Sequence, residues 1–213
     1  MLREKQELKA ARFPVPSQML EPQNQSSDSD QPSDSELFAR ARSGQTAAFA
    51  EIIDRYKDSL VGYLVRLAGN RERAEDIAQD AFLRLYQRSG GYQERGQLKA
   101  YLFRIATNQL RSEERRAHRW DRIRSLLEPR NGGPPAQEQA LLQDELKREL
   151  LKALAALPLR YRAALVLHEI KGWSYRNISE TLHCNEGTVK SRIHRGRSLL
   201  KRSLAPYWQG ASG

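Results

Sequence analysis

The stretch from Glu186 to Lys201 constrains the fold of this chain more than any other part of the sequence. In a helix each residue turns about 100° from the one before it, so residues three or four positions apart share one stripe. The stripe that we predict to be buried comprises Val189, Ile193, Gly196 and Leu200. The opposite face carries Lys190, Ser191, His194, Arg195, Ser198, Lys201 and Arg202. Cations and short hydroxyls on one face are suited to binding phosphates and base edges.

The residues before this helix predict what kind of site it forms. Residues 173–182 have the pattern of a short helix, with Ser174 as its N-cap, and a tight turn follows over residues 183–186. Two short helices joined in this way, the second of them cationic, predict a helix-turn-helix that lies in the major groove. The alternative is a helical hairpin with a solvated charged face, but solvated faces usually mix charges of both signs.

The overall charge also indicates a polyanionic partner. The chain has 213 residues and a formal net charge of +10, which favours nucleic acid or an anionic membrane surface. No apolar run approaches the about 18 residues that a membrane helix requires, and Met1–Arg12 is too polar for a signal sequence. The sequence therefore predicts a soluble cytoplasmic protein without membrane insertion.

Helical periodicity recurs along the chain and no strand pattern competes with it, so we expect an all-α fold of two small helical domains. Residues 1–34 are rich in Pro, Gln and Ser and are predicted to be a disordered tail. The first domain spans 35–120, with a helix capped by Asp34 or Ser35 at its start. A Gly- and Pro-rich stretch predicts a flexible linker over 121–136. The second domain, with the helix-turn-helix, spans 137–205, and 206–213 form a C-terminal tail.

The predicted helix over residues 71–88 has a face whose charge is opposite to that of the whole chain. Its polar side shows Asp76, Gln79 and Asp80 around one bare apolar residue, Leu83. The pattern is typical either of a solvated helix face or of a face that docks on a basic protein partner.

The next predicted helix, from Gln97 to Trp120, carries a basic ladder on its outer side. Its members recur at intervals of four, three and four: Arg104, Asn108, Arg111 and Arg115. The Gly-rich loop before this helix contains Tyr92, which either packs on the helix or stacks on an unpaired base. This ladder is a second candidate nucleic-acid surface.

Enzyme chemistry finds little support in the sequence. The Gly pairs lack the strand-loop-helix context of a phosphate loop, and the four histidines are scattered without metal-ligand spacing. The single cysteine, Cys184, cannot form a disulfide within the chain and is interpreted as a small filler in the turn rather than a redox switch. We therefore predict a binding protein, not an enzyme, with no cofactor and no metal.

The motifs resemble those of a known family. Residues 157–162, 172–182 and 187–197 are similar to the C-terminal DNA-binding region of bacterial sigma factors, especially the extracytoplasmic-function group. Independently, residues 74–85 and 100–108 resemble motifs of the N-terminal domain of that family. The resemblance covers about residues 35–204.

The resemblance implies roles for the faces described above. The residues expected to dock on the polymerase largest-subunit clamp helices are Asp76, Gln79, Asp80 and Leu83. The residues expected to open the minus-10 element and hold a flipped base or grip phosphates are Tyr92, Arg104, Asn108, Arg111 and Arg115. The recognition helix would read the minus-35 element with Lys190, Ser191, His194 and Arg195. Thr188 and Arg192, nearer the rim, would contact phosphate.

The resemblance further implies core RNA polymerase, including its flap, promoter DNA and an anti-sigma factor as partners. Some residues depart from the family pattern: Tyr101 stands where Trp is usual, and Ser112 where Asp is common. A helix-turn-helix regulator that binds operators as a homodimer without replacing a sigma factor is the main alternative. An RNA-binding protein is a third possibility.

Overall fold

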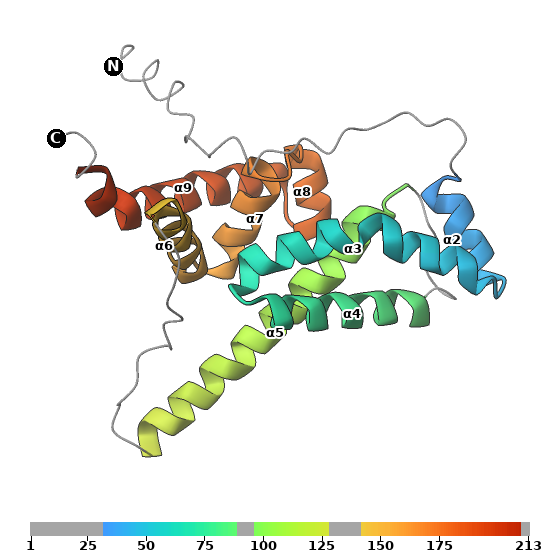
Figure 1. Ribbon diagram of the computed structural model, residues 1–213, viewed down its shortest axis with the longest axis horizontal. Coiled ribbons are helices and arrows are strands. Elements are labelled where there is room, and N and C mark those ends of the chain that lie inside the picture. Colours follow the sequence, from blue (N-terminus) through green and yellow to red (C-terminus); the bar gives the residue numbers. More distant parts are fainter. Residues whose placement is uncertain (1–31, 89–95, 128–141, 210–213) are drawn as a thin grey trace, which may run out of the picture. The chain divides into compact units, whose positions relative to one another are not determined.

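The computed structural model describes residues 32–88, 96–127 and 142–209, and these residues form eight α-helices without a strand. The all-α prediction is confirmed for this part of the chain. The first four helices, which we call the N-terminal half, are α2 (Asp34–Arg42), α3 (Thr46–Ala68), α4 (Arg71–Gln87) and α5 (Leu98–Leu127). The C-terminal half comprises α6 (Leu142–Ala156), α7 (Leu159–Glu169), α8 (Tyr175–Leu182) and α9 (Glu186–Gln209). Both halves are drawn in Figure 1.

Helix α2 begins one residue earlier than the sequence pattern predicts. Its N-cap is Ser33, whose Oγ accepts from the Glu36 backbone N–H at 3.2 Å, while the Glu36 carboxylate accepts from the Ser33 N–H at 2.8 Å. This reciprocal pair satisfies two backbone donors that the helix leaves free. Asp34 is therefore not the cap. Its carboxylate instead accepts from Arg55 at 2.7 Å and ties the start of α2 to α3.

Helices α3 and α4 form a hairpin that supplies most of the core of the N-terminal half (Figure 1). Gly69 ends α3 with a φ of 71°, a left-handed conformation that glycine adopts without strain. Asn70 then caps α4 by accepting from the Arg73 N–H at 2.9 Å. The predicted apolar arc of α4 is buried throughout: Ala74, Ile77, Ala78, Ala81, Phe82 and Leu85.

Helix α5 crosses this hairpin and buries a hydrogen-bonded polar pair within it. The Tyr63 and Thr107 hydroxyls are 2.9 Å apart, and Thr107 also donates to the Phe103 carbonyl. Burial raises the pKa of Tyr63 far above its usual value, so this phenol stays neutral. Removing one partner of a buried pair leaves an unsatisfied polar group, which costs about 1–3 kcal/mol. The helix extends to Leu127, so residues 121–127 are helical where the sequence pattern predicts the start of a linker.

In the C-terminal half, α9 packs on α7 at close range because Gly196 faces it. A Cβ at this position would lie 3.4 Å from the Tyr161 carbonyl oxygen and 3.6 Å from the Leu165 Cβ. An ion pair from Arg197 to Glu169, with Nε to Oε1 at 2.9 Å, joins the same two helices beside this contact. Because Gly196 has no side chain, α9 can approach α7 closely.

The two halves also contact each other, α5 with α8 and α3 with α6 and α7. We call this contact the interface between the halves. Its main side chains are Ser59, Lys99, Phe103, Arg104 and Glu114 from the N-terminal half and Arg162, Lys171, Trp173 and His183 from the C-terminal half.

Candidate nucleic-acid interface

The helix-turn-helix is built from two capped helices. Ser174 caps α8 as predicted, because its Oγ accepts from the Asn177 N–H at 3.2 Å. His183 ends α8 in a left-handed conformation with a φ of 49°. Asn185 then accepts from the Thr188 N–H at 2.7 Å and starts α9. The sharp change of direction at His183 turns α9 away from the axis of α8.

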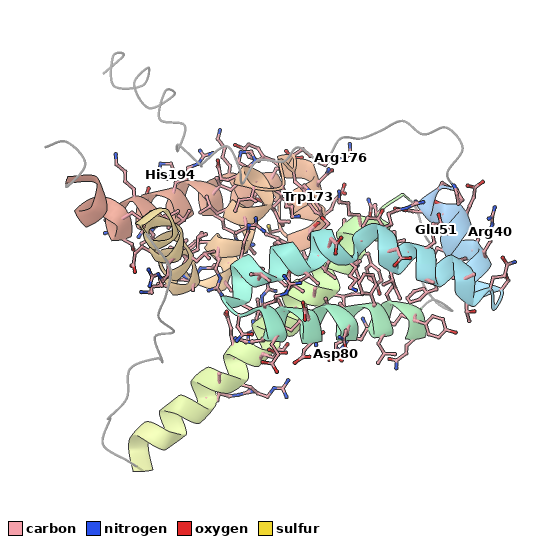
Figure 2. The ribbon with its side chains drawn as sticks, viewed as in Figure 1. Arg40, Glu51, Asp80, Trp173, Arg176 and His194 are labelled. Atoms are coloured by element: carbon pink, nitrogen blue, oxygen red, sulfur yellow. The ribbon has the colours of Figure 1, made fainter. Side chains whose placement is uncertain are left out.

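Helix α9 separates its two faces as its sequence predicts. The stripe that is buried comprises Val189, Ile193, Gly196 and Leu200. The face that is exposed comprises Lys190, Ser191, His194, Arg195, Ser198, Lys201 and Arg202. Figure 2 shows His194 on the outer side of this helix. A helix with this cationic exposed face presents donors to a phosphate backbone and to base edges.

The rim residues of α9 differ from those at its centre. Thr188 and Arg192 are half-buried, and the Arg192 guanidinium lies 3.4 Å from the Cys184 Sγ. Arg192 is therefore directed toward the turn. Ser191 donates its hydroxyl proton to the Thr188 carbonyl at 2.9 Å, which leaves its oxygen as an acceptor for a base donor.

The ladder on α5 is divided by the fold. Asn108 and Arg115 are exposed, and the Asn108 side-chain oxygen accepts from Arg111 at 3.1 Å. Arg104 is half-buried, lies over the Tyr101 ring with 4.8 Å from Cζ to the centroid, and contacts His183 Nε2. The first member of the ladder is thus in contact with the helix-turn-helix, whereas Asn108 and Arg115 remain accessible. Tyr92 lies outside the described residues.

The polar face of α4 borders a groove against α3. Gln79 and Leu83 line this groove of about 720 Å³, and the Leu83 side chain is 54% exposed. The other lining residues include Phe49, Ile53, Val61, Phe82 and Tyr86. Asp76 is exposed, whereas Asp80 accepts from the Gln109 amide at 2.7 Å and is held toward α5. Of the four residues predicted to bind polymerase, Gln79 and Leu83 therefore line the groove, whereas Asp76 and Asp80 lie outside it.

The interface between the halves contains three residues of the C-terminal half for which the sequence pattern predicted no role. Arg162 is 4% exposed and donates to the Glu114 carboxylate and the Ala155 carbonyl. Trp173 is 8% exposed, and Lys171 donates to Ser59 Oγ at 3.2 Å. Periodicity offered no signal for them, because their partners lie far away in the sequence. A tryptophan at the start of a polar helix was the one available hint.

Burial shifts the ionisation of the cations at this interface. It lowers the pKa of Arg162, an effect that Glu114 opposes, and it lowers the pKa of Lys171 to about 8 with further lowering by Arg66 and Lys99. The described residues contain no group of three or more His, Cys, Asp or Glu that could hold a metal ion. In the same residues no helix is both long enough and apolar enough to cross a bilayer.

Each half matches a family model. Residues 52–120 match sigma-70 region 2, and residues 147–200 match sigma-70 region 4. The region 2 match contains the α5 ladder, and the region 4 match contains the exposed α9 face from Lys190 to Ser198. The two candidate DNA surfaces thus fall within two regions of one family.

Full-length relatives agree with these matches. The chain is 36% identical over 183 residues to the ECF RNA polymerase sigma factor SigE of Mycolicibacterium smegmatis, covering 84% of this chain and 70% of that protein. It is 31% identical over 185 residues to the RNA polymerase sigma-H factor of Pseudomonas aeruginosa, covering 83% and 96%. It is 34% identical over 183 residues to the ECF RNA polymerase sigma factor SigW of Bacillus subtilis, covering 78% and 93%.

Two solved structures share the fold. The sigma factor RpoE in complex with the anti-sigma factor NepR from Bartonella quintana has a TM-score of 0.58 and 26% identity, covering 74% of this chain and 96% of that one. CnrH in complex with the cytosolic domain of CnrY has a TM-score of 0.61 and 22% identity, covering 82% and 99%. The chain belongs to the sigma-70 family of RNA polymerase sigma factors, in its extracytoplasmic-function (ECF) group.

Proposed function

We propose that this chain is an alternative sigma factor, which binds core RNA polymerase and directs promoter recognition and DNA melting. The observation that carries the proposal is that each half has a separate cationic surface within the matching sigma-70 region. Two weak DNA-reading modules on one chain bind two boxes with additive free energy when a scaffold holds them at the right separation. Core polymerase would be that scaffold.

The exposed face of α9 would read the minus-35 element in the major groove. Lys190 and Arg195 are long enough to reach guanine O6 and N7 or phosphates, and His194 lies between them along the helix. Each good bidentate pair discriminates against a wrong base by about 1–3 kcal/mol. Thr188 and Arg192, which are half-buried, would contact the phosphate backbone instead.

The exposed part of the α5 ladder would act on the minus-10 element. Asn108 presents an amide that can donate to a base edge, and Arg111 keeps its oxygen oriented. Arg111 and Arg115 would bind phosphates of the same strand, as would Arg104 in an arrangement that frees it from His183. Extruding a base costs a few kcal/mol of unstacking, which contacts in a pocket and with phosphates must offset. Tyr92 remains a proposed stacking partner. The chain supplies binding energy only, and its role includes no catalysed reaction.

The groove beside α4 would dock on the clamp helices of the polymerase largest subunit. Leu83 supplies an exposed apolar side chain and Gln79 a hydrogen-bonding rim, which is the composition of a typical protein interface centre. Asp76 and Asp80 would provide charge complementarity at the edge. The C-terminal half would contact the flap. An anti-sigma factor is a further proposed partner, because a similar structure is described as a complex with one. All these partners place the proposed function in the cytoplasm.

The test is transcription in vitro with purified core polymerase on a pool of random-sequence templates, followed by sequencing of RNA 5′ ends. We expect initiation sites that share two sequence boxes and that depend on the chain. Leu83→Gln should weaken core binding by about tenfold, since truncating an interface centre costs about 1–2 kcal/mol or more. Gln87→Ala, exposed on the same helix outside the groove, is the matched control.

The same experiment separates the alternatives. A regulator that does not replace a sigma factor would bind operator DNA as a homodimer and would start no transcription with core polymerase alone. An RNA-binding protein would show comparable affinity for structured RNA. Absence of both core binding and promoter-specific initiation would overturn the sigma proposal.

A further inference from the structure

Three cations gather beside Trp173, which is labelled in Figure 2. They are Arg66 of α3, Lys99 of α5 and Lys171 between α7 and α8, and we call them the cation cluster. The Lys171 ammonium donates to Ser59 Oγ of α3 at 3.2 Å. The Lys99 ammonium lies 5.4 Å from the centroid of the Trp173 ring, two residues after Lys171. Three separate segments of the chain thus bring positive charge to one place.

Arg66 lies over the same face of α3 as Ser59. Its Nη1 donates back along the helix to the Gly62 carbonyl at 2.7 Å. Residues three and four positions apart are neighbours on a helix surface, so this contact directs the guanidinium toward the Ser59 hydroxyl that accepts from Lys171. Burial, with the neighbouring charges of Arg66 and Lys99, lowers the pKa of Lys171 to about 8. The three cations are therefore close enough to repel one another.

No carboxylate of the described residues forms an ion pair with a member of the cation cluster. Asp34 acts on Lys99 without pairing with it, because Arg55 Nη1 holds the Asp34 carboxylate at 2.7 Å. The first turn of α5 also contains no acidic residue and carries Lys99 instead. Like charges that are partly removed from water repel, so the cluster opposes folding unless an anion neutralises it.

The surroundings of the cluster favour a small, multiply charged anion over a DNA backbone. Lys99 is exposed, whereas Arg66 and Lys171 are half-buried between helices. A small solute can approach half-buried cations from the solvent side, while duplex phosphates are better met by fully exposed cations such as those of α9. A phosphodiester also carries a single charge, whereas a terminal phosphate carries nearly two at neutral pH. Ammonium and guanidinium groups are the usual protein ligands of phosphate.

We propose that Arg66, Lys99 and Lys171 form a binding site for a small phosphate-bearing solute with at least two negative charges, such as pyrophosphate or a nucleoside triphosphate. The guanidinium would donate its remaining N–H groups to phosphate oxygens, and the two ammonium groups would neutralise the remaining charge. A bound anion would replace repulsion among the cations with attraction to all three. The site belongs to neither DNA face nor to the groove beside α4, so the inference does not depend on the proposed sigma function.

Isothermal titration calorimetry of the full-length chain with sodium pyrophosphate, in buffer without magnesium, tests the site. We expect Lys99→Gln and Lys171→Gln each to weaken binding by about tenfold, as expected when one charge-assisted hydrogen bond is lost. A parallel titration with ATP distinguishes the two sources of phosphate. Equal affinity for ATP and pyrophosphate means that the site recognises phosphate groups alone, and higher affinity for ATP means that the nucleoside also contributes. Either result supports the site.

Lys152→Gln is the matched control. Lys152 carries the same charge on α6, but its ammonium already pairs with Glu149 at 2.7 Å. This variant lowers the net charge by the same amount and should leave pyrophosphate affinity unchanged. Thermal denaturation separates lost binding from lost folding. Without anion, Lys171→Gln should be at least as stable as wild type at pH 7.5, because it removes one of three like charges. Pyrophosphate should then raise the Tm of wild type and Lys152→Gln more than that of Lys171→Gln.

Four outcomes would overturn the site. Equal pyrophosphate affinity in wild type, Lys99→Gln and Lys171→Gln would show that the cluster does not bind the anion. An equal loss in Lys152→Gln would indicate attraction by net charge alone. Citrate that bound as tightly, with the same dependence on the two cluster lysines, would reject phosphate as the ligand class. An equal loss of affinity for a DNA duplex would assign the cluster to a DNA surface. Chain-dependent transcription remains a separate test of the sigma function in every case.

Discussion

Lys171 lies at the interface between the halves, where its ammonium donates to Ser59 Oγ at 3.2 Å. Burial removes water from this ammonium, and two further cations face it, Arg66 from α3 and Lys99 from α5. Asp34 is the carboxylate that acts on Lys99. These surroundings lower the pKa of Lys171 from 10.5 to about 8. Lys171 thus makes the stability of the interface between the halves depend on pH.

The pH dependence follows from proton linkage. Between pH 8 and pH 10.5 the unfolded chain keeps a proton on Lys171 that the folded chain has lost, so the contribution of this residue to stability rises with pH in that window. Below pH 8 Lys171 is protonated in both the folded and the unfolded chain, so its destabilising effect no longer changes with pH. We expect the free energy of unfolding of wild type, minus that of Lys171→Gln, to increase across this window in urea titrations. A difference that stays flat or falls would contradict the assignment.

At Asn108 we expect a substitution to impair DNA opening without impairing closed-complex binding. Its amide is exposed on α5 and oriented by Arg111, so Asn108→Ala removes the proposed contact to a flipped base without disturbing the core. We expect permanganate reactivity of the melted strand to fall by about tenfold, as expected for a contact of about 1.4 kcal/mol, with little loss of closed-complex binding. Ser112→Ala, one turn further along the exposed side, is the control. Equal loss of both signals would reject the base-capture role.

At the scale of the element, α9 depends on its close approach to α7 at Gly196. A methyl group at this position meets the Tyr161 carbonyl at 3.4 Å, which is ordinary contact, and alanine favours a helix by about 0.5–1 kcal/mol over glycine. Gly196→Ala should therefore change stability by less than about 1 kcal/mol. Gly196→Val adds further methyl groups against the same backbone and should cost about 1–3 kcal/mol.

Chemical denaturation of the Gly196→Ala and Gly196→Val variants measures how closely α9 packs on α7. The residues proposed to contact the minus-35 element lie on the opposite face of α9, so duplex binding by Gly196→Ala should remain at the wild-type level. A stable Gly196→Val variant would mean that α9 can shift away from α7.

At the scale of the whole molecule, the proposed function requires core polymerase to set the separation of the two DNA surfaces. Inserting about five base pairs between the two boxes of a responsive promoter rotates one box by about half of a 10.5-base-pair turn. We expect chain-dependent initiation to fall by about tenfold or more, because additive binding requires both halves to engage one face of the duplex. Runoff transcription measures this loss, and the uninserted template is its control. Unchanged initiation would indicate that one half suffices.

Local sequence pattern predicted the helices and their faces well. The buried stripe of α9, the apolar arc of α4 and the Ser174 cap are each set by residues within a few positions, so periodicity and capping chemistry were enough to find them. The cap of α2 was misplaced by one residue because three adjacent polar residues, Ser33, Asp34 and Ser35, can all cap. The roles of the DNA-binding and polymerase-binding residues remain proposals.

By itself the sequence determined an all-α chain with two cationic surfaces on two helical regions, because helical period and charge are local properties. Only the tertiary structure decided which of these residues meet. Arg162 pairs with Glu114 across 48 positions, and Arg104 contacts His183 across 79. Pairings at such separations depend on how whole helices pack, which no local pattern encodes. The interface between the two halves is therefore a property of the fold.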